Sequence, residues 1–417
     1  MIKEMATKAR IASRELASTS YHKRQEVLLA IAKSIESNLL EIVKTNSEDV
    51  ARERGMGMNE SLLDRLTLDE SRVRAIAAAT RKVATLSDPL GIVKISRKLE
   101  NGLELKQVTV PFGVVGMIYE ARPNVTVDAA VILLMSANAA LLRGSSSARL
   151  TNSYLVDLMR KVVAQHGLNQ DLIQLVPSED RDSALELLKA RGAVDLVIPR
   201  GSAALIRTVV DEALVPTIET GAGVCHIYFD AKADSEKAIP ILLNAKTQRP
   251  SVCNAVETLL IHRSRKADLL PLALLQLQAN KVRMNCDEEC LAIAKTLGID
   301  ANLATNLNFQ TEYGSLEINI VLVDDLDSAV EHIDHFGTKH TEAIITEDSD
   351  EAKRFVSMID AAAVMINAST RFTDGEEMGF GAEIGISNQK LHARGPMGLE
   401  AMTTTTWIVS GNGQVRS

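Results

Sequence analysis

Hydrophobic positions in the first 85 residues recur at spacings of three and four, which is the period of a helix. Apolar side chains at positions 27, 28, 31, 35, 39, 42 and 43 follow this spacing. The segment shows no catalytic pattern. We therefore expect helices that cover one side of a sheet formed later in the chain.

Between residues 92 and 111 the period changes to that of strands. Apolar side chains lie on both sides of Asn101-Gly102, a dipeptide that favours a two-residue hairpin turn. A hairpin with so little core of its own needs other structure to pack against. We expect an arm at about residues 95–111 that pairs with another subunit.

From residue 113 onward, strand-like and helix-like segments alternate. Strands separated by helical crossovers form a parallel sheet with helices on both faces. The sequence therefore predicts an α/β protein in which a second alternation begins near Cys225. The strands expected in the first alternation are residues 113–119, 140–143, 172–176, 194–198 and 215–219.

Length and charge narrow the class of protein. A chain of 417 residues exceeds one ordinary core, so two or three domains are expected. The net charge of −8, without a basic run, argues against a nucleic-acid partner. The longest apolar run, residues 129–142, is too short and too polar to span a bilayer, and no secretory signal is visible. We expect a cytoplasmic protein without a membrane partner.

Cys253 is the candidate nucleophile. It lies between a predicted helix, residues 235–246, and a predicted strand, residues 256–262, in a tight loop that contains Pro250. A thiol attacks only when ionised, and Arg249, the basic neighbours Lys246 and His262, and backbone N–H groups around Asn254 offer positive charge. The alternative is a small buried residue, the commonest state of free cysteine.

The other cysteines indicate neither disulfides nor metal. Positions 225, 253, 286 and 290 are irregularly spaced, which does not suit a disulfide framework. Cys286 and Cys290 fit one helix face, but a structural zinc site needs four ligands and no second pair is present. No metal site is expected.

Two strand-to-helix loops are candidates for phosphate binding, although both common glycine-rich phosphate motifs are missing. Arg143-Gly-Ser-Ser-Ser147 and Arg200-Gly-Ser202 place small residues, hydroxyls and free N–H groups at a positive helix end. The alternative for each loop is a serine that only caps a helix and a glycine that only forms a turn.

Long segments from Leu90 onward match one known family. On these segments the chain resembles the gamma-glutamyl phosphate reductases, or glutamate-5-semialdehyde dehydrogenases, a branch of the aldehyde dehydrogenase superfamily. The resemblance implies NADPH-dependent reduction of L-glutamyl 5-phosphate to L-glutamate 5-semialdehyde and phosphate, the second step of proline biosynthesis. The matching segments are residues 110–128, 218–226, 247–258, 340–346 and 367–398.

The resemblance assigns roles to four catalytic candidates. Cys253 forms a thioester with the substrate, and a hydride from NADPH then reduces it. Arg122 stands where hydrolytic relatives carry an asparagine, so it is expected to act on the leaving phosphoryl group or the developing oxyanion, with Asn124 nearby. Glu219 matches the general base of those relatives. Reducing a thioester needs no activated water, so Glu219 is expected to tune the thiol or the cofactor ring.

Cofactor contacts also follow from the resemblance. Ser146 replaces a glutamate that would repel a ribose 2′-phosphate, and Arg143 adds a positive charge, so NADPH is favoured over NADH. Glu312 is assigned to the nicotinamide ribose, with Glu317 as its rival. The predicted cofactor contacts are Arg143, Gly144, Ser145, Ser146, Gly201, Ser202 and Glu312.

Ser369, Thr370 and Arg371 are the candidates for the substrate carboxylate. The expected partners are the small-molecule substrate, further copies of the chain in a homo-dimer or homo-tetramer, and transiently glutamate kinase. Two positions depart from the family: Arg249 replaces a commoner tyrosine, and the run Thr403-Thr-Thr-Thr-Trp407 lacks a lysine. The second departure lies in the tail that in the superfamily pairs with a neighbouring subunit's hairpin.

The expected fold is aldehyde-dehydrogenase-like, with two α/β domains and a small β oligomerisation arm. Residues 1–224 form the cofactor-binding domain, helical at first and then Rossmann-like, residues 225–385 the catalytic domain, and residues 386–417 a return segment and oligomerisation tail. Two alternatives remain at this point, an NAD-dependent aldehyde dehydrogenase that hydrolyses its thioester and a non-catalytic oligomeric scaffold.

Overall fold

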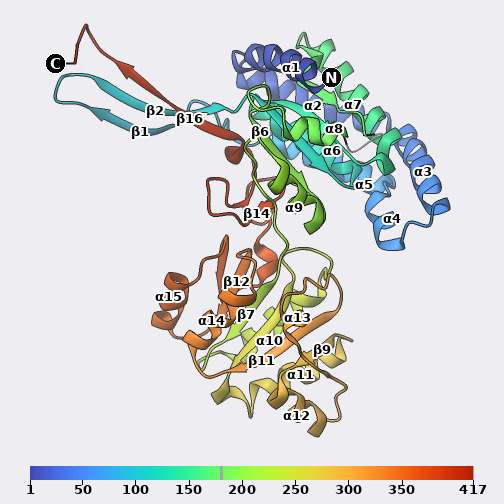
Figure 1. Cartoon of the computed structure of the whole chain (residues 1–417), viewed down its shortest axis with the longest axis vertical. Coiled ribbons are helices and arrows are strands. Elements are labelled where there is room, and N and C mark those ends of the chain that lie inside the picture. The colour runs from blue at the N-terminus through green and yellow to red at the C-terminus, as the bar shows by residue number, and fades with distance from the viewer. Residues whose placement is uncertain (179–181, 417) are drawn as a thin grey trace. The chain divides into compact units, whose positions relative to one another are not determined.

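The computed structural model describes residues 1–178 and 182–416. The chain divides into two compact units (Figure 1). Unit 1 is Met1–Thr220, Gly379–Gly385 and Pro396–Ser417, and unit 2 is Gly221–Met378 and Ile386–Gly395.

The predicted N-terminal helices are confirmed. Apolar side chains at the predicted spacing are buried, among them Val27, Ile31 and Ile35. The serine before α2 accepts a hydrogen bond from Lys23 N, and Asp69 caps α5 in the same way. The helices are α1 Ile2–Ala17, α2 Tyr21–Ser37, α3 Leu39–Gly55, α4 Glu60–Leu66 and α5 Glu70–Ala84.

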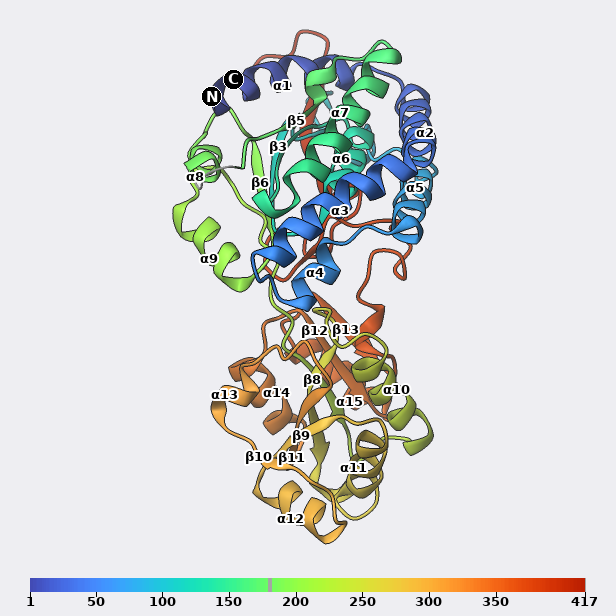
Figure 2. The ribbon, with the colours of Figure 1, turned by 90° about the vertical axis from the view of Figure 1, so that its right-hand side faces the viewer.

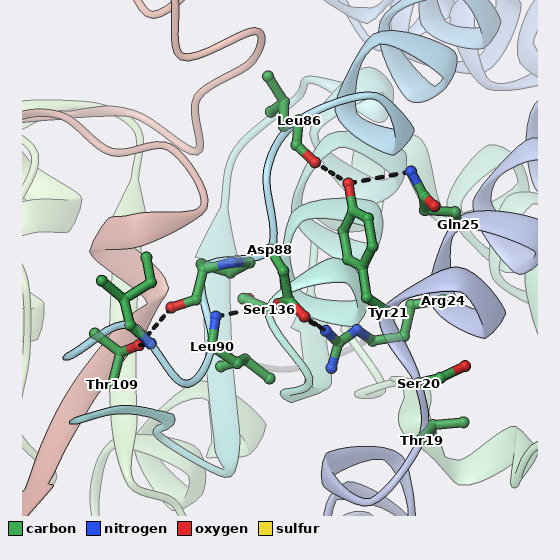
Figure 3. A network of polar contacts seen from close by, with 12 residues as sticks. Thr19, Ser20, Tyr21, Arg24, Gln25, Leu86, Asp88, Leu90, Thr109 and Ser136 are labelled. Carbon is green, nitrogen blue, oxygen red and sulfur yellow. Dashed lines mark hydrogen bonds and ion pairs between the residues drawn. The ribbon is translucent and has the colours of Figure 1, made fainter.

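A polar network fastens α2 to the segment that leads into the arm (Figure 3). The Arg24 side chain is 2% exposed, and its Nη2 donates to both carboxylate oxygens of Asp88 at 2.7 and 2.8 Å. The Tyr21 hydroxyl donates to the Leu86 carbonyl oxygen. Further on, the Thr109 hydroxyl donates to the carbonyl oxygen of Pro89 at 2.7 Å. The base of the arm is thereby fixed to the helical layer.

The described part of unit 1 contains a parallel sheet of four strands in the order β5-β4-β3-β6. The strand expected at residues 215–219 is wrong. That segment makes only an isolated bridge between Val197 and Thr217, because Pro216 has no N–H to extend the ladder. The strands are β3 Val114–Tyr119, β4 Ala139–Arg143, β5 Ile173–Leu175 and β6 Leu196–Arg200.

Helix α6 (Pro123–Met135) is buried on nearly all sides. It packs against α7 (Arg149–Gln165) and against α2 and α5 of the N-terminal layer (Figure 2). The N-terminal helices thus mainly cover α6 and α7, and only α1 packs strongly on the sheet, at β3 and β4. The unit also contains α8 Asp182–Leu188 and α9 Ala203–Glu212. No helix in residues 1–178 or 182–416 combines the length and hydropathy needed to cross a bilayer.

The arm is a three-stranded antiparallel sheet in the order β1-β2-β16 (Figure 1). The hairpin is confirmed, but the two-residue turn is wrong: Leu99 N donates to Leu103 O, so residues 100–102 form a longer loop, with Gly102 at a φ of 85°. The hairpin pairs with the C-terminal strand of its own chain. The strands are β1 Val93–Lys98, β2 Glu104–Pro111 and β16 Thr403–Ser410.

Unit 2 lies wholly within the described residues and contains a parallel sheet of seven strands, in the order β10-β9-β11-β8-β7-β12-β13. Hydrophobic clusters lie on both faces of this sheet. The strands are β7 Cys225–Phe229, β8 Val256–His262, β9 Arg283–Cys286, β10 Asn302–Leu303, β11 Glu317–Val323, β12 Thr341–Ile345 and β13 Ala363–Ile366, and β14 Ile386–Ser387 and β15 Gly395–Pro396 form a separate pair.

Helices α10 and α11 pack on one face of this sheet and α14 on the other (Figure 2). Cys286 ends strand β9 and Cys290 lies on α12, so the expectation that they share one helix is wrong. Both are buried in the hydrophobic core. The helices are α10 Ser235–Thr247, α11 Leu269–Ala279, α12 Glu288–Thr296, α13 Asn306–Phe309, α14 Leu326–Phe336 and α15 Ser349–Met358.

Candidate active site

Cys253 lies where the sequence predicts it, on the loop between α10 and β8. Pro250 follows the end of α10 and prevents its continuation. Ala255 N donates to Val252 O at 3.0 Å, which closes a turn around the cysteine. Cys253 is partly exposed, whereas Cys225, Cys286 and Cys290 are buried. In the described part of the chain, Cys253 is therefore the thiol that a ligand can reach.

The segment that leads into β7 contacts the backbone of Cys253. A Cβ added at Gly223 would overlap the carbonyl group of Cys253 and lie 2.9 Å from its Cα, so only glycine allows this approach. Cys225 Sγ donates to the same carbonyl oxygen at 3.3 Å. Burial raises the pKa of the Cys225 thiol well above its usual value, so Cys225 stays protonated and remains a donor.

A second contact joins the cysteine loop to the segment that carries Arg371. Asn254 Nδ2 donates to Thr373 O at 2.9 Å, and Arg371 Nε donates to Gln248 Oε1 at 3.0 Å. Burial lowers the pKa of Arg371, while Asp374 and Cys253 act in the opposite direction. The Arg371 side chain is thus bonded to the residue that follows α10, at the start of the cysteine loop.

Ser369 and Thr370 differ from Arg371 in exposure. Ser369 Oγ accepts from Arg371 N at 3.3 Å and so caps a short 3-10 turn. Thr370 is 0% exposed, and its hydroxyl has no hydrogen-bond partner in unit 2, all of which is described. Arg371, which is partly exposed, is the member of this trio best placed to meet a ligand.

Glu312 and its rival Glu317 are in different environments. Glu317 Oε1 accepts from Asn285 Nδ2 at 2.9 Å, and Glu317 Oε2 lies 3.5 Å from Arg283 Nη1. Glu312 is exposed on the loop before β11. The assignment of the nicotinamide ribose to Glu312 stays a prediction.

In unit 1, the loop after β4 carries four of the predicted cofactor contacts. Ser145 Oγ accepts from Ser147 N at 3.2 Å and caps a 3-10 turn at Ser146–Ala148, as the capping alternative predicts. A Cβ at Gly144 would overlap the Asn152 amide and lie 3.0 Å from the Tyr119 ring. Arg143 ends β4 beside this loop. Arg52 Nη2 also donates to Ser147 O at 2.8 Å, a contact of α3 that the sequence did not reveal.

The second loop, before α9, binds the carboxylate of a side chain from the same unit. Ser202 N and Ser202 Oγ donate to the carboxylate of Glu120 at 2.7 and 2.8 Å. Ser202 Oγ also accepts from Leu205 N at 3.4 Å, so Ser202 caps the helix as well. At Gly201, a Cβ would lie 2.7 Å from the Glu120 carboxylate. The contact agrees with the general preference of helix N-termini for negative charge.

The remaining predicted residues of unit 1 lie at the start of α6 and at the end of the unit. Arg122 is the residue before α6. Asn124 Nδ2 donates to Asp128 Oδ2 at 2.9 Å. Burial raises the pKa of Asp128 to about 6, although Arg200 and Asn124 favour its ionised form. Glu219 is partly exposed and precedes Thr220, the last residue of this part of unit 1.

Sequence reasoning missed the contacts that fix the nucleophile loop. Gly223 and Cys225 lie in a segment that the sequence singled out, but the contact of either with Cys253 depends on β7 lying beside β8. The ion pair between Lys246 and Glu257 was also missed: the sequence offered Lys246 only as a positive neighbour of the thiol, and both side chains are fully buried. An acid inside the mainly apolar run Val256–Ile261 was the available signal, because buried carboxylates need a partner.

Comparison with known proteins identifies the family of the chain. The chain matches the Aldehyde dehydrogenase family over residues 1–292. Gamma-glutamyl phosphate reductase of Thermobifida fusca is 50% identical over 417 residues, covering 100% of this chain and 98% of the relative. The protein of the same name from Clavibacter michiganensis is 51% identical, covering 98% and 94%. The crystal structure of gamma-glutamyl phosphate reductase from Thermotoga maritima superimposes with a TM-score of 0.96 at 42% identity, covering 99% of each chain.

Aldehyde dehydrogenases are oxidoreductases that use a nicotinamide cofactor. That Ser202 and Ser145 contact the phosphates of this cofactor stays a prediction. The family match covers more than half of the chain, and the relatives are similar along its whole length. The chain belongs to the aldehyde dehydrogenase family, in the branch formed by the gamma-glutamyl phosphate reductases.

Proposed function

We propose that this chain reduces L-glutamyl 5-phosphate to L-glutamate 5-semialdehyde and phosphate, with NADPH as reductant and Cys253 as nucleophile. The observation that supports it most directly is a partly exposed thiol on a loop whose backbone is held by Gly223, Cys225 and Asn254. In this proposal the protein is a cytoplasmic homo-oligomer that acts in proline biosynthesis and meets glutamate kinase transiently.

Cys253 Sγ, as the thiolate, attacks the acyl carbon of the substrate. The C–O bond to phosphate breaks, and phosphate leaves with the electron pair, which gives a thioester on Sγ. A bound nicotinamide supplies the hydride for the next stage. After reduction the C–S bond breaks, which releases the aldehyde and restores the thiolate.

The chain's own groups stabilise negative charge in both tetrahedral stages. The backbone N–H of Cys253 is one oxyanion donor in this proposal. Arg122 and Asn124, both at the start of α6, are assigned to the leaving phosphoryl group and the oxyanion. Asn124 keeps its amide oxygen for other contacts, because its Nδ2 binds Asp128. Glu219 tunes the thiol or the nicotinamide ring.

The cofactor proposal assigns recognition of the 2′-phosphate to Arg143 and Ser146. Ser146 is exposed and carries no negative charge that would repel the phosphate. Gly144, Ser145, Gly201 and Ser202 offer backbone N–H groups and hydroxyls to the remaining phosphates. Glu312 binds the nicotinamide ribose.

The reverse reaction tests the proposed function. With glutamate 5-semialdehyde and NADP, we expect reduction of NADP that depends on added inorganic phosphate, because phosphate must cleave the thioester. We also expect NAD to support a rate at least about 10-fold lower, given the charge-assisted contact that its ribose lacks. Turnover without phosphate would identify a hydrolytic aldehyde dehydrogenase, and no change in nicotinamide absorbance would support a scaffold.

Arg371 is predicted to bind the substrate α-carboxylate. We expect Arg371→Ala to raise the KM for the semialdehyde about 30-fold, because it removes a charge-assisted contact from a partly buried site. Steady-state kinetics against the semialdehyde measures this. Arg354→Ala is the control, since Arg354 is exposed and pairs only with surface acids. An unchanged KM in the Arg371 variant would exclude the role.

A further inference from the structure

A lysine and a glutamate form an ion pair in the interior of unit 2. Lys246 Nζ lies 2.7 Å from Glu257 Oε2, and both side chains are 0% exposed. The same ammonium donates to the Val256 carbonyl oxygen at 2.9 Å. Buried charges are costly unless they are paired with good geometry, so this arrangement calls for an explanation.

The pair spans the base of the nucleophile loop. Lys246 lies in the last turn of α10, before the loop, and Glu257 lies in β8, after it. Lys246 Nζ therefore bonds to two groups at the far end of the loop, the Glu257 carboxylate and the Val256 carbonyl. These bonds join the two ends of the loop formed by residues 247–255. They thereby fix the distance between the loop ends that flank Cys253.

A third segment meets the same pair. The Tyr313 ring centroid lies 6.0 Å from Lys246 Nζ, within range of a cation–π contact. The Tyr313 hydroxyl donates to Asn319 Oδ1 at 2.7 Å and accepts from Asn285 Nδ2 at 2.9 Å, which holds the ring on the sheet. Tyr313 directly follows Glu312, the candidate ribose contact. The ion pair thus adjoins both the thiol loop and the segment assigned to the cofactor.

Electrostatics accounts for why both partners are needed. Burial raises the pKa of Glu257, against the attraction of Lys246, and the charge of Glu312 raises it further. Burial lowers the pKa of Lys246, against the attraction of Glu257. The pair carries no net charge. Removing one partner would leave an uncompensated polar group in the interior.

We propose that Lys246, through Glu257 and the Val256 carbonyl, is a positioning residue that holds the Cys253 loop in the geometry needed for attack on the substrate. This role rests on the proposed function of Cys253 as nucleophile. A salt bridge that only stabilised the fold would change the free energy of unfolding. Loss of the Lys246–Glu257 pair is expected to change the position of the thiol more than the binding of substrate.

The test compares Lys246→Met with Lys237→Met. Lys237 is on the same helix and pairs with Glu347 at 2.7 Å, but both side chains are about half exposed, so it is a matched control. In Lys246→Met we expect kcat to fall roughly 30-fold, with KM within about threefold, because small displacements of a nucleophile reduce rate strongly. Alkylation of Cys253 by iodoacetamide should slow as well, and Lys237→Met should match wild type in every measurement.

Should Lys246→Met fail to fold, the double variant Lys246→Met with Glu257→Gln replaces the pair by two neutral groups and is expected to fold. It should show the same fall in kcat. Hydrogen exchange adds a readout that does not depend on chemistry: amides of residues 247–256 should exchange faster than in wild type. A folded variant with wild-type kcat and exchange overturns the proposal. Activity in Cys253→Ser would instead overturn the nucleophile assignment, and the exchange result would still decide the role of Lys246.

Discussion

Cys253→Ser will reduce the phosphate-dependent oxidation of glutamate 5-semialdehyde at least about 1000-fold, because a serine hydroxyl is hardly ionised at neutral pH and no neighbouring base activates it in this proposal. The replacement is close in volume, and the side chain is partly exposed, so the fold should be retained. The rate of NADP reduction with wild type and variant side by side gives the result.

Selective labelling provides the control for this prediction. The native wild-type chain should take up one equivalent of iodoacetamide, at Cys253, because the other three cysteines are 0% exposed. Cys290→Ala removes one of those buried thiols and should keep wild-type activity and labelling. Labelling that spares Cys253, or reduction that continues at its former rate after this thiol is blocked, would contradict the nucleophile assignment.

Local sequence signals located the nucleophile loop well. Pro250 cannot continue α10, and the apolar run after Ala255 becomes a fully buried strand, so a loop between them was predictable. The N-terminal helices were equally clear from their spacing. In contrast, β9 and α12 were not predicted, because Arg283 and Asn285 break the apolar pattern of a four-residue strand.

Contacts across the sheet could not be read from the sequence. Cys225 reaches the carbonyl oxygen of Cys253, which is 28 positions away, only because β7 and β8 are neighbours. Strand order is a property of the whole unit, and periodicity within one strand says nothing about it. Lys246 and Glu257 are both buried, whereas charged residues are usually exposed, so residue type alone would predict both side chains at the surface.

Gly223→Ala is expected to lower kcat about 300-fold while the chain stays folded. The added Cβ would overlap the carbonyl carbon and oxygen of Cys253, which are backbone atoms and cannot rotate away. The nucleophile loop would have to shift, and a displacement of about 1 Å at a reacting group already costs on the order of 100-fold in rate. Such a shift would also disturb the hydrogen bond from Cys225 Sγ. Steady-state kinetics, the rate of Cys253 alkylation and thermal unfolding together separate a displaced thiol from a lost fold.

Two other glycines give graded controls for the same substitution. The atoms nearest to a Cβ at Gly221 belong to the side chain of Asn388, which can change rotamer by giving up its hydrogen bond to Thr338 O, so Gly221→Ala should lose less activity than Gly223→Ala. A Cβ at Gly55, the last residue of α3, would meet nothing within 4 Å, and Gly55→Ala should keep full activity with stability unchanged or slightly raised. Wild-type kcat in a folded Gly223→Ala chain would mean that the approach of this glycine to the Cys253 carbonyl does not set the position of the thiol. The graded order is expected because the cost depends on what the new methyl group meets: an immovable backbone, a side chain that can turn, or open space.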